Sequence, residues 1–258
     1  MAIYRNGKPI SSPKRSVSNG TIHIVSLQVA DYIMPNTSIT IGMNWKLKMP
    51  EILQSRTGKA HDSTYFIGYW FPQVAVYDDI VGWDTDGYTG ITETYNDVSN
   101  YSVKIKVPGN YFLWATGKLL NPEDVYSESF IKKMNISKTS DEVIRLVTKE
   151  DLKNGGLLVS QAFHEWAFKA DQVPDFSFAI SNHYLWDATS ALTDKKTGKK
   201  TWVSMVYPPD QFNYNLGAMA AKESIEYFSE ISPGIPFPYD KHISVFGEFA
   251  SGMEFPMM

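Results

Sequence analysis

The sequence predicts a mainly β protein, in which an antiparallel β-sandwich or saddle is followed by a shorter α/β segment. Aromatic residues make up 14% of the 258 residues, and aromatic side chains favour strands. From residue 20 to 206, short apolar or alternating runs are separated by turn residues, as in sandwiches. After Pro208-Pro209 the spacing becomes that of a helix. These changes divide the chain into 1–207 and 208–258.

The clearest predicted strand spans 101–107. Apolar residues at odd positions from Val103 to Val107 alternate there with polar residues at even positions. One face of the strand therefore packs on a core while the other meets water. The other predicted strands of the first part are 21–25, 38–47, 111–116, 143–147, 157–168, 176–181 and 201–207.

Two short helices are predicted to interrupt these strands. In 122–134, Pro122 stands in the first turn and acidic residues follow it directly. The second helix spans 149–154, and Gly155 ends it. Both are expected to lie on the surface of the sandwich.

The second part of the chain opens with a predicted helix at 213–230. Its apolar residues recur at spacings of three and four, which places them on one stripe of a helix. Pro233 and Gly234 stop this helix, and a strand is predicted at 242–247. The stripe consists of Ala218, Ala221, Ile225 and Phe228.

Composition excludes several classes of function. The net charge is -4, and no basic run is longer than a pair such as Lys195-Lys196 or Lys199-Lys200, so nucleic acid is not an expected partner. The absence of cysteine excludes disulfides, thiolate nucleophiles and Cys-ligated zinc. We find no signal-peptide pattern at the start of the sequence and no apolar run near the roughly 18 residues that span a bilayer. The localisation stays open.

The end of the chain carries a candidate binding motif, Ser251-Gly252-Met253-Glu254. Glycine lets a backbone approach a ligand closely, and a glutamate two residues later can bind an ammonium group through a charge-assisted hydrogen bond. From chemistry alone, a tight turn with an exposed glutamate is the simpler interpretation.

No metal ligands are predicted in this chain. A zinc peptidase needs two histidines one helical turn apart and a glutamate beside the first, as in His-Glu-x-x-His. His164-Glu165 is followed by Trp166-Ala167-Phe168 within a predicted strand, so we interpret His164 as structural. The other histidines are too scattered along the sequence to form a recognisable ligand set, and we expect surface or packed positions for His23, His61, His183 and His242.

A cluster of acidic residues, Asp78-Asp79 with Asp84, has two interpretations. Carboxylates so close together can bind calcium or act as a paired acid and base. They can also accept structural hydrogen bonds, and the neighbouring aromatic residues favour this second interpretation.

Four blocks of the sequence resemble one known family in the family's order. Residues 236–241, a strand, and then Gly252-Met253-Glu254 with an aromatic residue and proline resemble the segment of the membrane alanyl aminopeptidase family that leads into its Gly-x-Met-Glu-Asn motif. These gluzincin enzymes are also called the aminopeptidase N family. The other similar blocks are 69–72 with 75–79, 82–85 and Tyr88; 110–122; and 168–187.

The resemblance implies a fragment of a zinc metallopeptidase. Residues 1–207 would be its N-terminal β domain, lacking the first strands, and 208–258 the truncated start of its thermolysin-like catalytic domain. Glu254 would bind the free α-amino group of a peptide substrate, while Gly252 and Met253 line the scissile bond. Zinc would belong to the intact enzyme, with ligands outside this chain. The chain alone would be inactive, its partners being a peptide substrate and the missing catalytic portion, and the parent could be a periplasmic or secreted bacterial protein.

A non-catalytic alternative is a β-sandwich module that binds carbohydrate or protein through exposed Trp and Tyr side chains. A complete module predicts a closed domain. A fragment predicts unpaired strand edges and a helix at 213–230 whose apolar face lacks partners. The apolar residues at the end of the sequence, Phe255 to Met258, favour the fragment.

Overall fold

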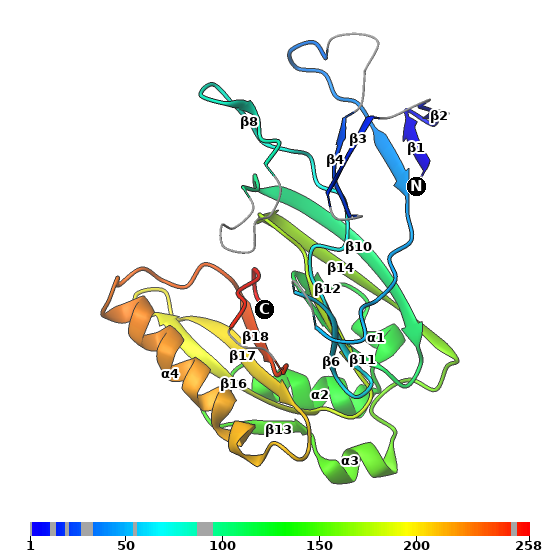
Figure 1. Ribbon diagram of the computed structural model, residues 1–258. Coiled ribbons are helices and arrows are strands. Elements are labelled where there is room, and N and C mark those ends of the chain that lie inside the picture. The colour runs from blue at the N-terminus through cyan, green and yellow to red at the C-terminus, as the bar shows by residue number, and fades with distance from the viewer. Residues whose placement is uncertain are drawn as a thin grey trace. The chain divides into compact units, whose positions relative to one another are not determined.

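The computed structural model describes the ranges 2–10, 14–18, 21–26, 33–53, 56–86, 95–248 and 252–258. The architecture is mainly β, with several antiparallel sheets and few helices (Figure 1), which confirms the predicted fold class. Among the helices in these ranges, none is long and apolar enough to cross a bilayer. The chain forms two compact units: unit 1 consists of Met1–Lys48 and Pro72–Asp97, and unit 2 of Met49–Phe71 and Val98–Met258.

Unit 1 contains short antiparallel strand pairs. Strand β4 confirms the strand predicted at 21–25, while the strand predicted at 38–47 is shorter than expected. The pairs are β1 (Ala2–Arg5) with β2 (Lys8–Pro9) and β5 (Ile41–Asn44), β3 (Lys14–Ser18) with β4 (Thr21–Ser26), and β8 (Tyr77–Asp78) with β9 (Gly82–Trp83).

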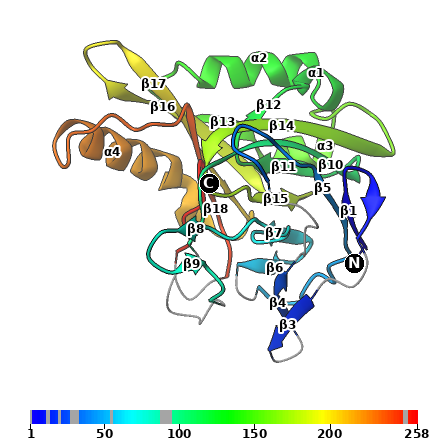
Figure 2. The same cartoon turned by 90° about the horizontal axis from the view of Figure 1, so that it is seen from above.

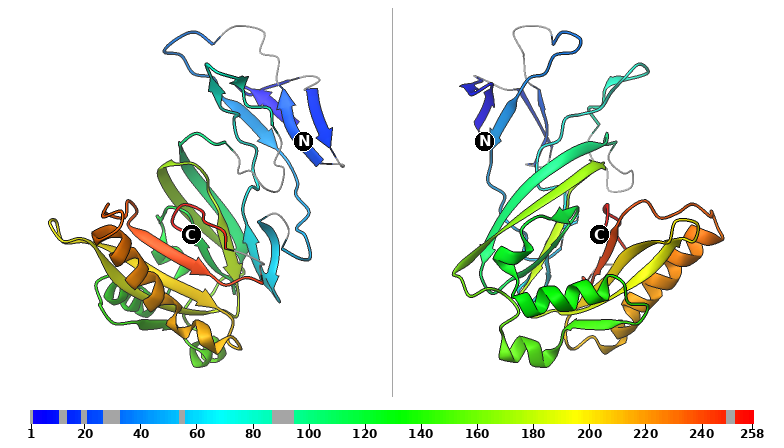
Figure 3. Two further views of the ribbon diagram at one scale, coloured as in Figure 1. Left: turned by 60° about the vertical axis from the view of Figure 1, so that its left-hand side comes forward. Right: turned by 180° about the vertical axis from the view of Figure 1, so that it is seen from behind.

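Unit 2 contains three larger sheets, which are antiparallel except for the parallel pair β17–β18. Its long neighbouring strands β10 and β14 are visible in Figure 3. The sheets are, in order of pairing, β10 (Ser99–Pro108), β14 (Phe163–Val173) and β12 (Lys118–Leu119); β11 (Phe112–Ala115), β15 (Phe178–Ser181), β7 (Thr64–Ile67) and β6 (Thr57–His61); and β13 (Ile144–Val147), β16 (Leu185–Asp194), β17 (Lys199–Tyr207) and β18 (Lys241–Val245).

The strand predicted at 101–107 is confirmed as the centre of β10, where Ile105 and Val107 are buried and Lys104 and Lys106 are exposed. The strand predicted at 157–168 begins only at Phe163. Strands β11, β13, β15, β17 and β18 confirm the predictions at 111–116, 143–147, 176–181, 201–207 and 242–247 within a few residues at each end.

The sheet that ends in β18 lies between two helices (Figure 2). Helix α4 (Gly217–Glu230) packs on one face, where Ala218 belongs to one apolar cluster with Met205 and Ile225 to another with Val203. Helix α2 (Glu128–Ser137) lies against the other face, where the Trp202 indole donates a hydrogen bond of 3.0 Å to Ser137 Oγ. Because both faces are covered, β16 is buried along most of its length.

Helix α4 follows a short 3-10 helix, η1 (Phe212–Leu216), and occupies most of the range predicted for a helix. Its buried positions are Ala218, Ile225 and Ser229, but Phe228 is 56% exposed, so its assignment to the apolar stripe was wrong. At about 100° per residue, Phe228 lies roughly 80° from Ala218 around the helix. Strands β16 and β17 cover the buried face of this helix. The fragment interpretation predicts that this face lacks partners, and that expectation was wrong.

The helix predicted at 122–134 is divided in two. Helix α1 (Pro122–Val125) ends at Tyr126, whose extended backbone pairs with Leu158. Helix α2 then begins at Glu128, and the side chain of its N-cap residue, Ser127, accepts a hydrogen bond of 3.4 Å from the Phe130 amide. Because Ser127, inside the predicted range, caps the start of a new helix, the range contains two helices instead of one.

Helix α3 (Lys149–Asn154) has the predicted bounds and ends at Gly155, with φ of 68°. At its start, the Asp151 amide donates to Thr148 Oγ1 (3.1 Å), and Asp151 Oδ2 accepts from the Thr148 amide (2.9 Å). This reciprocal capping box satisfies two amides that the helix leaves without partners.

We expect Thr148→Ala to lower the free energy of unfolding by about 1 kcal/mol, because it removes the hydroxyl that accepts from the Asp151 amide. Thr148→Ser retains a hydroxyl and should change stability by only a few tenths of a kcal/mol. Urea unfolding of both variants measures the difference. Equal stabilities for the alanine and serine variants would show that the cap contributes nothing.

Three tryptophans, Trp114, Trp166 and Trp186, are fully buried between the sheets and helices of unit 2. The rings of Trp114 and Trp186 meet edge to face at 5.5 Å, and those of Tyr126 and Trp166 at 5.2 Å. Edge-to-face contacts of this kind are favourable beyond the area that they bury. The high aromatic content therefore serves a packed core, and this core supports the candidate site.

Candidate functional site

Residues 252–258, here called the C-terminal segment, lie next to strand β18. The Ile243 amide donates a 3.0 Å hydrogen bond to the Met257 carbonyl oxygen. Phe255 and Met258 exchange two backbone hydrogen bonds of 3.0 Å, and Met257 between them has a φ of 68°. The segment therefore ends in a tight turn held against the edge of the sheet.

Phe255 anchors this segment. Its side chain is only 6% exposed, and its ring contacts those of Phe66 (5.6 Å between centroids) and Tyr69 (5.3 Å). Gly68 allows this contact, since a Cβ there would stand 2.4 Å from Phe255 Cζ. Phe255 therefore has a packing role.

The loop after β11 also holds the C-terminal segment. Thr116 Oγ1 donates a hydrogen bond of 3.0 Å to the Pro256 carbonyl oxygen, and the Gly117 amide lies 3.2 Å from the Met257 sulfur. Ser177 Oγ lies 3.7 Å from the Met258 sulfur. The stretches around Thr116, around Ser177 and at 256–258, which are distant in the sequence, are thus neighbours in unit 2.

The predicted substrate-binding residues lie at the start of the C-terminal segment. Gly252 and Glu254 are exposed, while Met253 is partly buried against the core. Glu254 Oε1 lies 3.2 Å from the point that a Cβ on Gly252 would occupy, so the carboxylate folds back over the glycine. Ser251, which precedes them, lies outside the described residues. Their role in substrate binding stays a prediction.

Lys241 is a partly buried lysine next to this site that sequence reasoning missed. Its Nζ donates a 2.5 Å hydrogen bond to the Ala115 carbonyl oxygen and lies 5.7 Å from the centre of the Phe168 ring. Burial lowers the pKa of Lys241 to about 7. Its position in β18 could have indicated this, because residues two apart in a strand share a face, and Lys241 therefore shares the face of the inward-facing Ile243 and Val245.

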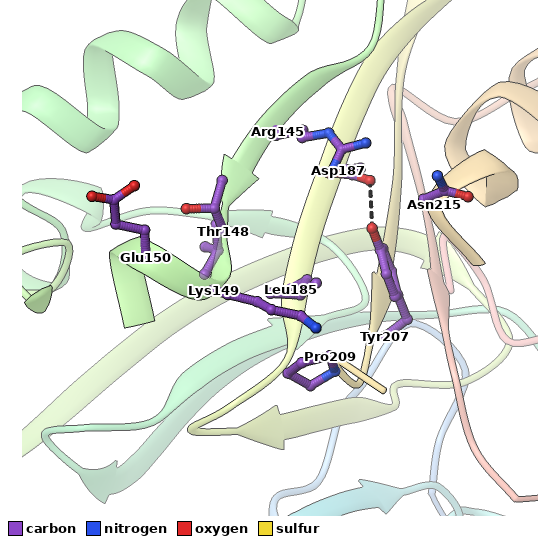
Figure 4. A pocket seen from close by; sticks show the side chains of 10 residues that line it. Arg145, Thr148, Lys149, Glu150, Leu185, Asp187, Tyr207, Pro209 and Asn215 are labelled. Atoms are coloured by element: carbon purple, nitrogen blue, oxygen red, sulfur yellow. Dashed lines mark hydrogen bonds between the residues drawn. The ribbon is translucent and has the colours of Figure 1, made fainter. Parts of the chain in front are cut away.

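A separate pocket of about 360 Å³ opens beside β13, β16 and β17 (Figure 4). Within it the Tyr207 hydroxyl donates a hydrogen bond of 2.8 Å to Asp187 Oδ2. Burial raises the pKa of the Asp187 carboxyl, and burial with the Asp187 contact raises the pKa of Tyr207. Arg145 and Lys149 add positive charge to the lining. None of the predicted substrate-binding residues lines this pocket.

The acidic cluster of unit 1 accepts structural hydrogen bonds. Asp78 Oδ1 accepts from the amides of Ile80 (2.9 Å) and Val81 (2.8 Å), which form the turn between β8 and β9. These amides hold the pKa of Asp78 below its usual value. Asp84 Oδ1 accepts similarly from the Asp86 amide at 3.2 Å. The structural interpretation is confirmed for Asp78 and Asp84.

Two of the five histidines, which are distant in the sequence, lie next to each other in the structure. His164 is confirmed as a buried residue of a strand, β14. His61 and His183 are far apart in the sequence, yet their ring centroids are 5.7 Å apart in the structure. His242 bonds to Ser244 at 2.9 Å, and the side chain of His23 lies outside those described. The expected surface or packed positions are confirmed for His61, His183 and His242, whereas nothing in the sequence indicated that His61 and His183 are neighbours.

Comparison with known proteins gives a likeness in fold. No protein-family model matches the sequence. No curated protein matches it either. Among solved structures, aminopeptidase A of Legionella pneumophila, in complex with aspartic acid, is similar with a TM-score of 0.53 and 12% sequence identity. The match covers 95% of this chain and 23% of that one, so this chain spans under a quarter of that protein's length. The chain thus shares its fold with part of that structure.

Proposed function

We propose that this chain is part of a zinc-dependent aminopeptidase of the gluzincin type, in which the C-terminal segment binds the amino terminus of a peptide substrate. The observation that carries the proposal is the fixed placement of this segment. Phe255 is buried, the Pro256 carbonyl is bonded and Met257 is held by β18, while the neighbouring Glu254 stays exposed. The likeness in fold to part of aminopeptidase A is consistent with this role.

In this proposal each residue has a distinct task. The Glu254 carboxylate accepts hydrogen bonds from the substrate ammonium group, and such charged contacts are stronger than neutral ones. Gly252 lets the substrate backbone approach closely because it has no side chain. Met253 lines the scissile bond. The buried anchor keeps these groups in place before the substrate arrives, which favours a productive orientation.

The histidines of this chain do not fit the zinc site of that family. His164-Glu165 lies in a strand instead of a helix, His164 is buried, and Phe168 stands where a second histidine is needed. In our proposal the zinc ligands are supplied by another part of the enzyme, and this chain alone is inactive. The expected boundary between the two domains, at 207/208, falls directly after β17. The assignment of 208–258 to the start of a catalytic domain is part of the same proposal.

The test is hydrolysis of aminoacyl fluorogenic amides with added zinc. We would assay this chain and a longer chain that includes the residues encoded downstream in the same reading frame. Only the longer chain should be active, and only on substrates with a free amino group. Glu254→Gln should lower its kcat/KM by about 10- to 150-fold, because a hydrogen bond to a charged group contributes roughly 1.5–3 kcal/mol.

Glu223→Gln is the matched control, since Glu223 is an exposed glutamate of α4 and should be replaceable without effect. Unchanged kcat/KM in the Glu254 variant, or equal cleavage of N-acetylated substrates, would refute the proposed role of Glu254. A longer chain without hydrolytic activity would refute the peptidase proposal itself.

One observation favours a second candidate, a carbohydrate-binding or protein-binding module. Tyr77 and Trp83, in the β8–β9 pair, are 65% and 57% exposed, and their rings meet edge to face at 5.1 Å. Exposed aromatic pairs of this kind provide apolar faces for a ligand. Glycan or protein binding that Trp83→Ala abolishes, together with no hydrolysis by the longer chain, would favour this candidate.

A further inference from the structure

Two turns of unit 2 bring His61, Asp62 and His183 together. His61 ends β6 and Asp62 follows it in the turn to β7, while His183 lies between β15 and β16. One ligand atom from each of the three residues lies within 4.8 Å of the other two. The two imidazole rings are tilted by 36° to each other. Side chains from two separate turns thus converge on one point.

The nitrogens that remain without a hydrogen bond are suited to a metal ion. His61 Nδ1 and His183 Nε2 are both buried and have no hydrogen-bond partner among the described residues. A buried polar atom without a partner is destabilising, so each such atom needs an explanation. A bound cation would give both nitrogens a partner.

The opposite nitrogen of His183 is already held in place. His183 Nδ1 lies 3.2 Å from Asn182 Oδ1, which also accepts a 2.6 Å hydrogen bond from Ser63 Oγ. An N–H on Nδ1 that donates to this amide oxygen leaves the lone pair on Nε2. Metal-binding histidines are commonly oriented by such a bond from their other nitrogen.

His61 has a similar arrangement with carboxylates. Its Nε2 lies 3.8 Å from Glu248 Oε1, and its Nδ1 lies 3.9 Å from Asp62 Oδ2. Glu248 is thus close enough to receive the Nε2 proton after a small movement, while Asp62 stands beside the free nitrogen. The two carboxylates add negative charge that attracts a cation.

We propose that His61, His183 and Asp62 form a site for a divalent transition-metal ion of the zinc class, with water in the fourth position. Two imidazoles and one carboxylate suit zinc, whereas calcium and magnesium prefer oxygen ligands alone. Ligand atoms at about 2.0–2.2 Å from a tetrahedral zinc lie roughly 3.3–3.5 Å apart. Side-chain rotations that close the cluster by about 1.5 Å would reach this geometry. The proposal is independent of the peptidase proposal.

Such a metal ion would connect the β6–β7 turn to the turn before β16. Because the ligands converge only in the folded chain, binding stabilises the folded state according to the metal concentration and the dissociation constant. We therefore expect zinc to raise the Tm of the 258-residue chain, and calcium to have no effect.

The experiment is titration of the tag-free chain with zinc chloride by calorimetry, with thermal unfolding as a second readout. The wild-type chain should bind one zinc ion. His61→Gln and His183→Gln should each weaken binding by at least tenfold, since each removes one ligand. His242→Gln is the matched control, because His242 bonds to Ser244 outside the cluster and should leave zinc binding unchanged.

If a histidine variant fails to fold, Asp62→Asn replaces it. The Asp62 side chain is exposed, and removing its carboxylate should still weaken zinc binding several-fold. Cobalt substitution gives a signature independent of stability, because tetrahedral cobalt with nitrogen ligands absorbs visible light. The visible absorption band of the cobalt-loaded protein should change in His61→Gln. Wild-type protein that binds no zinc would overturn the proposal, as would unchanged affinity in His61→Gln and His183→Gln.

Discussion

Phe255→Ala is expected to weaken the docking of the C-terminal segment by about 3–5 kcal/mol, the usual cost of removing a buried phenylalanine ring. The ring is almost fully buried between Phe66 and Tyr69, so its loss leaves a cavity. The Ile243 amide is the probe, because it donates to Met257. Its hydrogen exchange should become at least 100-fold faster as the segment opens more often.

Phe255→Leu serves as the control, since it retains an apolar side chain and should accelerate exchange much less. Gly68→Ala tests the same contact from the other side, because its Cβ would stand within 2.4 Å of the Phe255 ring. In the Phe255→Ala background, that contact is absent and the effect of Gly68→Ala should be smaller. If Ile243 exchanges at the wild-type rate in Phe255→Ala, the segment is not anchored by this ring.

Lys241→Met is expected to remove a pH dependence of stability. Burial lowers the pKa of Lys241 to about 7 in the folded state, whereas an unfolded lysine titrates near 10.4. Between these values the unfolded chain binds more protons, so stability rises with pH, by up to about 1.4 kcal/mol per unit. Below pH 7 both states are protonated, and the cost of burying the charge is present in full.

Urea unfolding at pH 7, 8 and 9 measures this slope in both proteins. The wild-type free energy of unfolding should rise over this range more steeply than that of Lys241→Met. The variant should also be more stable at pH 7, because methionine fills a similar volume without a charge. Lys104→Met, at an exposed position of β10, is the control and should keep the wild-type slope. Parallel pH profiles for the wild type and Lys241→Met would contradict the expected burial of charge.

Elements with local signals were predicted closely. Helix α3 has its expected bounds because Thr148, Asp151 and Gly155 carry the cap and the stop within the sequence itself. Strand β10 alternates because one face is solvated. Strand β16 was missed as an element because helices cover both faces, which removes the alternation. The single range 122–134 became two helices because Ser127 caps the second.

The sequence by itself determined the β-rich class, the helix at 149–154, the lack of a zinc-peptidase motif in this chain and the candidate motif at Gly252, Met253 and Glu254. These depend on residues that are neighbours along the chain. Only the tertiary structure decided that Phe255 is an anchor and that the Lys241 ammonium group is held against the Ala115 carbonyl oxygen. It also decided that His61 and His183 face each other. Such contacts join distant strands and turns, so they depend on the path of the whole chain, which local patterns do not encode.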